Sequence, residues 1–179
     1  LPFYWNNFSS KVFYSYIIPL KNRTIEVVQA DMYSKLRSEL KYAVKSAYII
    51  EEDIDFDTFY EVGEKTFLRQ GGKSPFSRPF LKNYCEQLTA KNAFKSFAVK
   101  DTSGRTMAIA GLIYDQHSTS LMINGFDYEI MQRGANEFLI FECIKFAKTK
   151  SDVFDFEGSM LEPIDSFYRK FGGEHTTYF

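Results

Sequence analysis

The sequence predicts a mixed α/β fold, with one mostly antiparallel sheet, a central parallel strand-helix-strand unit and helices on both faces. Apolar stretches alternate with turns in the middle of the chain, and residues 96–100, 107–114 and 120–126 are typical of three antiparallel strands of a meander. An amphipathic helix (133–149) and a short apolar strand (152–157) follow. Because such a unit joins its strands by a right-handed crossover, we expect the strands on either side of this helix to be parallel.

The first quarter of the chain supplies two more strands and a long helix. Aromatic and branched side chains predict a strand over residues 11–20 and a short one over 48–50. Apolar side chains at three- and four-residue spacing predict a helix over residues 25–47. The opposite face of this helix carries a basic strip, formed by Lys35, Arg37, Lys41 and Lys45. Such a strip is typical of a helix face exposed to solvent. The alternative interpretation is a surface that binds a phosphorylated or carboxylated substrate.

Four further elements complete the predicted order. Asp57 or Thr58 is expected to cap a helix, and residues 77–89 predict another, opened by a serine and a proline in its first turn. A short helix over residues 163–171 and a strand over 174–179 end the chain. This order of strands and helices is typical of a single layer of sheet with helices on its faces.

The composition is that of one globular domain. The chain has 179 residues, of which 45% are hydrophobic and 18% aromatic, so it can bury a full core, and we expect a single domain over residues 11–179. The formal net charge of −1 argues against a dedicated nucleic-acid-binding protein, which is normally strongly basic. A tRNA partner is therefore not favoured, although a local basic patch would suit one.

The cysteines and the hydropathy indicate the compartment. Cys85 and Cys143 lie far apart and outside any metal-ligand spacing, which indicates reduced side chains in an intracellular protein and no metal site. No apolar run is long enough to span a membrane, and no signal peptide is visible. We expect a cytoplasmic protein without a membrane partner.

Candidate functional residues gather at the carboxyl ends of the two parallel strands. Asn124 and Gly125 end the first strand, Glu157 and Ser159 follow the second, and Gly134 precedes the helix between them. Ligands of strand-helix-strand units bind at this edge, where the N-terminus of the helix also points. The sequence therefore predicts one crevice that holds any chemistry.

Three motifs and the element order resemble the GNAT acyltransferases. Residues 154–159 (FDFEGS) look like the strand end of the Fem-type branch, which comprises peptidoglycan aminoacyltransferases and their acetyltransferase-like relatives. Residues 168–172 (YRKFG) are similar to the Tyr-x-x-x-Gly segment that closes the family's acyl-CoA site. Residues 16–20 (YIIPL) and the basic helix after them are similar to the opening of a Fem-type repeat. The resemblance covers the chain from Phe13 onward.

The resemblance implies an N-acyltransferase. The donor would be acyl-CoA, acetyl-CoA above all, or aminoacyl-tRNA, and the acceptor an amine, such as one on a peptidoglycan precursor. The pyrophosphate of CoA would lie against Gln132, Arg133, Gly134 and Ala135, where this chain has one glycine and the family has two small residues. The helix N-terminus and Arg133 still suit a phosphate. Because Fem-type proteins commonly hold two repeats, residues 1–10 are expected to be the tail of a preceding one.

The same resemblance assigns roles in catalysis. The acyl oxygen would be held by backbone N–H groups near Asn124, Gly125 and Phe126, and Tyr168 would be the general acid. The alternative for Tyr168 is a core aromatic. The FDFEGS motif would supply the remaining groups: its two acids, Asp155 and Glu157, share one face of a strand and are candidate bases, or they form ion pairs with a neighbouring helix.

Two interpretations stay open beyond these roles. Ser159 fits a loop cap or a bond to a pantetheine amide better than a nucleophile. The irregular glycine loop also allows a GNAT-like binding or structural module without catalysis.

Overall fold

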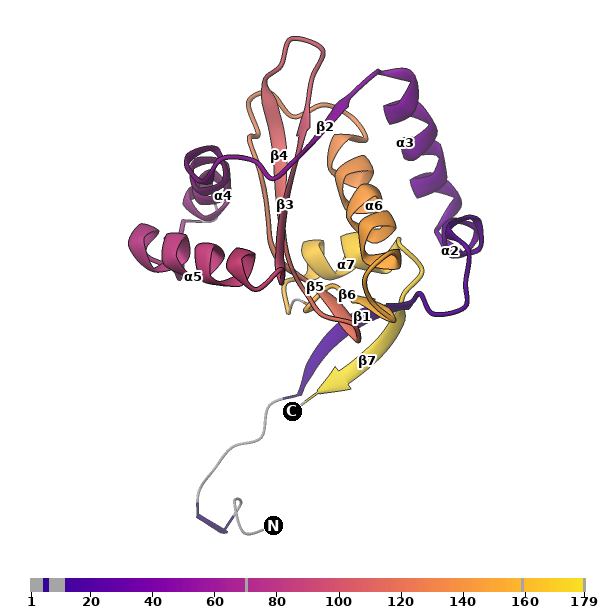
Figure 1. Ribbon diagram of the computed structural model, residues 1–179. Coiled ribbons are helices and arrows are strands. Elements are labelled where there is room, and N and C mark those ends of the chain that lie inside the picture. Colours follow the sequence, from indigo (N-terminus) through magenta and orange to yellow (C-terminus); the bar gives the residue numbers. More distant parts are fainter. Residues whose placement is uncertain (1–4, 7–11, 70, 159, 179) are drawn as a thin grey trace.

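The computed structural model describes residues 5–6, 12–69, 71–158 and 160–178. Within these ranges, seven strands form one sheet in the order β2-β3-β4-β5-β6-β1-β7 (Figure 1). The strands are β1 (Phe13–Pro19), β2 (Ile49–Glu52), β3 (Phe94–Lys100), β4 (Thr106–Tyr114), β5 (Ser118–Phe126), β6 (Val153–Asp155) and β7 (Glu174–Tyr178). Only β5 and β6 pair in parallel, as expected for the strand-helix-strand unit. The predicted mixed, mostly antiparallel sheet is confirmed.

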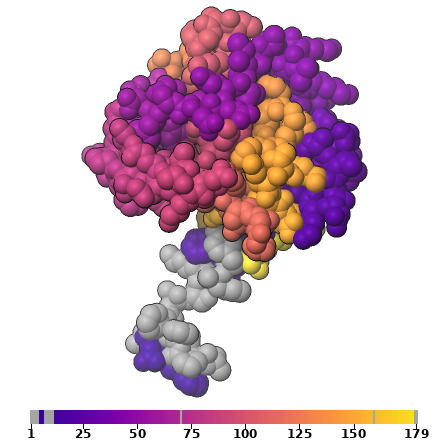
Figure 2. All heavy atoms as spheres, in the orientation of Figure 1, coloured from indigo at the N-terminus to yellow at the C-terminus, as the bar shows by residue number. Residues whose placement is uncertain are grey.

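Helices cover both faces of this sheet, as the sequence predicts. The described helices are α2 (Ile25–Asp31), α3 (Ser34–Lys45), α4 (Phe56–Arg69), α5 (Arg78–Ala90), α6 (Ala135–Lys148) and α7 (Glu162–Arg169). Figure 1 shows α4 and α5 on one side of the sheet, with α2, α3 and α6 on the other. In the space-filling view the orange residues of α6 are flanked by the indigo and purple residues of α2 and α3 (Figure 2). Apart from the helix over 25–47, predicted ends lie within about two residues of those observed.

Strand alternation sorts the apolar side chains into two cores. On β3, Phe97 and Val99 join the larger cluster beneath α2, α3 and α6, whereas Ala98 joins the smaller one beneath α4 and α5. Burying a large apolar side chain contributes roughly 1.5–3 kcal/mol. A register slip of one residue would exchange the two sets, so both cores together fix the register of the strands.

The predicted helix over residues 25–47 is two helices, because the chain breaks at Met32 and Tyr33. Met32 has extended backbone angles (φ −65°, ψ 148°) yet stays fully buried. The Tyr33 N–H donates to the Lys170 carbonyl at 2.9 Å, and the Arg37 guanidinium donates to the Ala30 carbonyl at 2.9 Å. The segment after α7 thus satisfies the backbone at the break, and Arg37 belongs to this joint rather than to an open basic strip.

Asp55, and not Asp57 or Thr58, caps helix α4. Its carboxylate accepts from the Thr58 N–H at 2.8 Å and from the Thr58 hydroxyl at 2.7 Å. These hydrogen bonds also lower the pKa of Asp55. The correction moves the start of α4 to Phe56, which packs against the smaller core.

Strands β5 and β6 separate soon after they meet. Their register pairs Ser118 with Val153, Thr119 with Phe154 and Ser120 with Asp155, and β6 ends there. Strand β5 runs on to Phe126 beside β4 alone. The six residues after Ser120 therefore lack a strand neighbour on one edge, and this edge borders the site described below.

Gly158 of the FDFEGS motif allows the chain that leaves β6 to cross β1 closely. Its φ is +66°, and a Cβ there would lie 1.7 Å from the Tyr14 carbonyl oxygen. Gly104 has a similar φ of +84°, but a Cβ there would meet nothing within 4 Å. A side chain at Gly104 would add only the strain of a left-handed backbone, whereas one at Gly158 would add the same strain and a steric clash. Comparing substitutions at the two glycines therefore measures the two costs separately.

We predict that Gly104→Ala lowers the free energy of unfolding by about 1 kcal/mol, since only backbone strain is added. Gly158→Ala should lower it by at least about 3 kcal/mol, because two backbone segments must also move apart. Urea denaturation followed by circular dichroism measures both. Equal losses for the two variants would contradict the close approach at Gly158.

Candidate functional site

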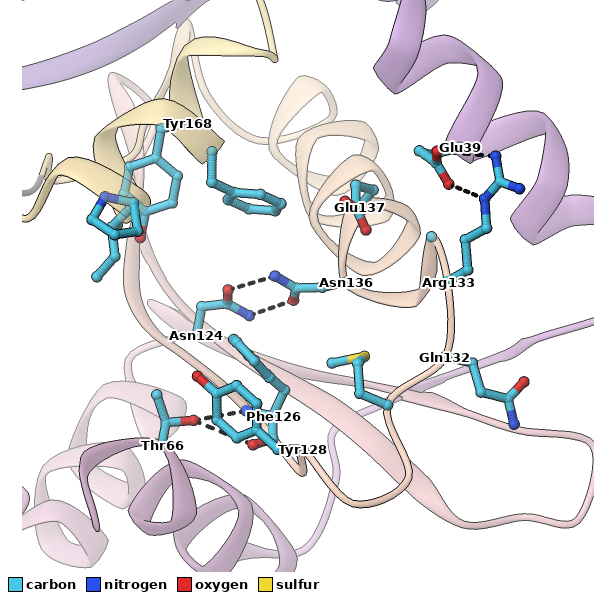
Figure 3. Close-up of a pocket in the computed structure, with 15 residues that line it drawn as sticks. Glu39, Thr66, Asn124, Phe126, Tyr128, Gln132, Arg133, Asn136, Glu137 and Tyr168 are labelled. Carbon is cyan, nitrogen blue, oxygen red and sulfur yellow. Dashed lines mark hydrogen bonds and ion pairs between the residues drawn. The ribbon is translucent and has the colours of Figure 1, made fainter. Parts of the chain in front are cut away.

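A cavity of about 670 Å³ opens where β5 leaves β6 behind. Its wall is built from the last residues of β5, the loop before α6, the first turn of α6, and α7, with Thr66 of α4 at one side. Figure 3 shows Tyr168 extending from α7 toward the cavity that Asn124 and Asn136 border from the other side. A cavity therefore lies at the carboxyl end of β5, although the described residues that follow β6 are not part of its wall.

Six of the predicted site residues lie in the wall of this cavity: Asn124, Phe126, Gln132, Arg133, Gly134 and Tyr168. They come from β5, from the loop before α6 and from α7, so the topology brings three separate segments together. Their roles in binding and catalysis stay predictions.

The other predicted residues lie elsewhere. Gly125 faces α4, where an added Cβ would lie 2.7 Å from the Gly63 Cα, and Ala135 is fully buried. Asp155 and Glu157 are not part of the cavity wall. Ser159, like most of residues 1–10, lies outside the described residues.

The two acids of the FDFEGS motif do not share one face of a strand. Strand β6 ends at Asp155, and Glu157 has a left-handed backbone with φ of +57°. The Asp155 carboxylate accepts from the Ser15 hydroxyl and, at 2.8 Å, from the Glu157 N–H. Asp155 therefore shapes the turn after β6; it is not in the wall of this cavity, and the described residues contain no ion pair with it.

The N-terminus of α6 presents unpaired N–H groups to the cavity. Gly134 precedes the helix with φ of +73°, and a Cβ there would lie 2.8 Å from the Glu39 carbonyl oxygen. Within the described part of the chain, the N–H groups of Asn136 and Glu137 have no hydrogen-bond partner. Together with the helix dipole, these groups favour an anion at this end of the cavity.

Charged side chains surround the same end. Arg133 donates to both carboxylate oxygens of Glu39, at 2.7 and 3.1 Å, and stacks over Tyr42 at 4.7 Å from the ring centre. The hydrogen bond from Arg133 lowers the pKa of Glu39. Glu137 also lines the cavity, and its carboxylate has no partner among the described residues. Of the two acids in the wall, one is neutralised and the other is not.

Tyr168 is a buried tyrosine with its ring against the core. It is 9% exposed, and its ring lies 4.6 Å from that of Phe156 between centres. Burial disfavours the phenolate and raises the pKa of Tyr168 to about 12. Its hydroxyl has no hydrogen-bond partner in the described residues. Tyr168 is thus a core aromatic that also lines the cavity, and its role as general acid stays a prediction.

Other wall residues were not among the predicted site residues, and three of them carry polar side chains that matter here: Thr66, Asn136 and Glu137. The Phe126 N–H donates to the Thr66 hydroxyl at 2.9 Å, which uses one of the backbone groups expected to hold the acyl oxygen. Asn136 and Asn124 form a reciprocal amide pair across the gap between α6 and β5 (Figure 3). In the sequence, the position of Asn136 and Glu137 just after Gly134 is the one indication that they lie at the site, and no pattern indicates Thr66.

Metal ligands and membrane helices are not found among the residues described. No three His, Cys, Asp or Glu side chains of these ranges come together as a metal site. In the same ranges, no helix has the length and apolarity that crossing a membrane requires. Cys85 and Cys143 are both free and buried.

Several solved structures share this fold. FemX superposes with a TM-score of 0.82 at 13% identity, over 91% of this chain and 59% of FemX. L-PGS from Bacillus licheniformis gives 0.62 at 13% identity, over 96% of this chain and 60% of L-PGS. Glucosamine-6-phosphate N-acetyltransferase from Arabidopsis thaliana superposes with a TM-score of 0.51 at 9% identity, over 72% of this chain and 92% of the acetyltransferase. This chain thus spans about three fifths of the length of FemX and of L-PGS.

Comparison of the sequence with protein-family models identifies the family to which the chain belongs. No curated protein sequence matches the chain significantly. The family model for the acetyltransferase (GNAT) domain matches residues 30–162, which is well over half of the chain and includes β5, the loop before α6, α6 and β6. With that match and the shared fold, the chain belongs to the GNAT acetyltransferase family.

Proposed function

We propose that this chain is an N-acyltransferase that transfers an acyl group from acyl-CoA, such as acetyl-CoA, to an amine. The observation that carries the proposal is that an anion-binding helix end, an amide pair and a buried protonated tyrosine line one cavity. Membership of the GNAT family supports the same reaction class. The peptidoglycan-precursor acceptor stays a prediction from the resemblance, and neither the cavity nor the comparisons support the aminoacyl-tRNA donor.

The pyrophosphate of the donor would bind at the start of α6. The unpaired N–H groups of Asn136 and Glu137 point to that end, and the dipole of a 14-residue helix adds to their attraction. Arg133 is held by Glu39, but its Nη1 group makes no hydrogen bond to the described residues and is available to a phosphate oxygen. Backbone groups therefore carry most of the recognition.

The transfer step needs one proton donor from the protein. The amine, as the free base, attacks the thioester carbonyl carbon, and the carbon–sulfur bond then breaks. The departing sulfur takes the proton of the Tyr168 hydroxyl, and the attacking nitrogen releases its extra proton to solvent. A proton from solvent then returns to the Tyr168 phenolate, so the enzyme is unchanged after one turnover. The hydroxyl of Tyr168 is protonated at neutral pH, as it would be even at the ordinary tyrosine pKa of 10.0, so the proton is present when the sulfur leaves.

We predict that Tyr168→Phe lowers kcat by about 100-fold while acetyl-CoA binding stays unchanged, because only the proton donor is lost. CoA release with a panel of primary amines measures turnover, and calorimetry measures binding. Tyr114→Phe is the matched control, since Tyr114 is also 9% exposed but bonds to Asn92 away from the cavity. A wild-type protein that binds acetyl-CoA and turns over none of the amines would favour the binding-module alternative instead.

The pKa of Tyr168 can be tested without any acceptor. The tyrosinate absorbance of the wild type minus that of Tyr168→Phe should titrate at about 12, above the ordinary value of 10.0. The folded state then holds a proton that the unfolded state has lost, so the wild type should lose stability between these two pH values more steeply than the variant. A difference titrating near the ordinary value would mean that the hydroxyl is solvated.

The unpaired carboxylate of Glu137 should weaken the binding of the donor's pyrophosphate. We predict that Glu137→Gln tightens acetyl-CoA binding roughly five-fold, equivalent to about 1 kcal/mol for one charge at a helix end. Glu142→Gln is the control, because Glu142 lies on the same helix and pairs with Lys145 outside the cavity wall. Calorimetry at low salt measures both, and weaker binding by Glu137→Gln would place the pyrophosphate elsewhere.

A further inference from the structure

A second cavity, of about 470 Å³, lies between α4, α5 and the first residues of β3. Figure 1 shows these two helices on the face of the sheet opposite to α6. The walls of the two cavities have no residue in common, so acyl transfer as proposed uses none of this space. The volume lies within the range of pockets that bind small molecules.

The inner wall of this second cavity is apolar and largely aromatic. Ile54, Phe59 and Cys85 are buried in it, and Phe56 and Phe94 are partly buried beside them. The rings of Phe59 and Phe94 meet edge to face, with 5.9 Å between their centres. An aromatic ligand gains from contact with such rings in addition to the gain from leaving water.

Ser96 places one polar group in this apolar wall. It is only 5% exposed, and it shares a face of β3 with Phe94 and Ala98, which belong to the smaller core. Its backbone carbonyl accepts from the Asp53 N–H at 2.8 Å, but its hydroxyl has no hydrogen-bond partner among the described residues. A buried hydroxyl without a partner is unfavourable, so a ligand that brings one hydrogen-bonding group to this depth is favoured.

The charged side chains of the wall balance one another. Asp53 pairs with Lys95 at 2.6 Å. Lys82 and Glu86 lie one turn apart on α5, both exposed, and within the described part of the chain neither has an ion-pair partner. One unpaired cation and one unpaired acid favour neither sign of charge on a ligand. The cavity therefore suits a neutral molecule.

We propose that this cavity binds a phenol, a neutral aromatic ring that carries one hydroxyl. The ring would lie against Phe56, Phe59 and Phe94, and its hydroxyl against that of Ser96. Each hydroxyl can both donate and accept, so the pair needs no further protein group. An alkyl chain would lose the ring contacts, and a carboxylate would bring an unpaired charge into an apolar space. Such binding is independent of acyl transfer.

The test compares 4-fluorophenol with fluorobenzene, which lacks the hydroxyl. Each probe is titrated into the whole chain, and ¹⁹F NMR gives its dissociation constant. We expect the wild type to bind 4-fluorophenol more tightly, although its hydroxyl must give up water that fluorobenzene never held. Ser96→Ala should weaken the binding of 4-fluorophenol about five-fold, the contribution of one neutral hydrogen bond, and leave that of fluorobenzene unchanged.

Ser120→Ala is the matched control, because Ser120 is a half-buried serine of strand β5 outside the wall of this cavity, and it should bind both probes as the wild type does. Binding of neither probe by the wild type, or binding of 4-fluorophenol no tighter than fluorobenzene, would overturn the proposal. So would a preference for the phenol that survives in Ser96→Ala. The wild-type comparison needs no variant, so it decides the matter even if Ser96→Ala fails to fold. No sample contains acetyl-CoA, so the result does not depend on the acyl-transfer function.

Discussion

The parting of β5 and β6 after Ser120 is the constraint on which the site depends. A strand edge inside a protein carries N–H and C=O groups that must find partners, and here no neighbouring strand supplies them. At the end of this edge, the hydroxyl of Thr66 on α4 accepts a hydrogen bond from the Phe126 N–H and lies 3.4 Å from the Phe126 carbonyl oxygen. The rest of the separation is lined by side chains and left open, so the same irregularity that costs hydrogen bonds creates a ligand-sized cavity.

The far wall of that cavity is held by packing that ties the end of the chain to its beginning. The rings of Tyr168 and Phe171 pack at a tilt against that of Phe156, which follows directly after β6. The next residue, Gly172, has φ of +77°, and a Cβ there would lie 2.5 Å from the Asp31 carbonyl oxygen. Helix α7 is therefore pinned between the core and the α2–α3 joint, and the position of its tyrosine is as rigid as that joint.

The sequence predicts what depends on local pattern. Periodicity identifies the strands and α6, and the lone glycine before α6 correctly marks the start of a helix facing the crevice. The break at Tyr33 is not predictable, because its partner is the carbonyl of Lys170, far along the chain. The same holds for Thr66 and Asn136, whose partners are chosen by the tertiary fold. The alternation rule failed at Glu157 because the strand had already ended.

Burial gives the two ends of the cavity different chemistry. The end at Arg133 and Glu39 is exposed to solvent on the arginine side, so its charges are screened and act weakly on a donor. On the α7 side, the cavity wall carries the neutral hydroxyl of Tyr168, whose ring packs into the core. Removal from water raises the pKa of Tyr168, because the buried phenolate would lose its hydration. The parted strands therefore leave one cavity with a charged, solvated end and a buried neutral hydroxyl, and these suit different parts of a ligand.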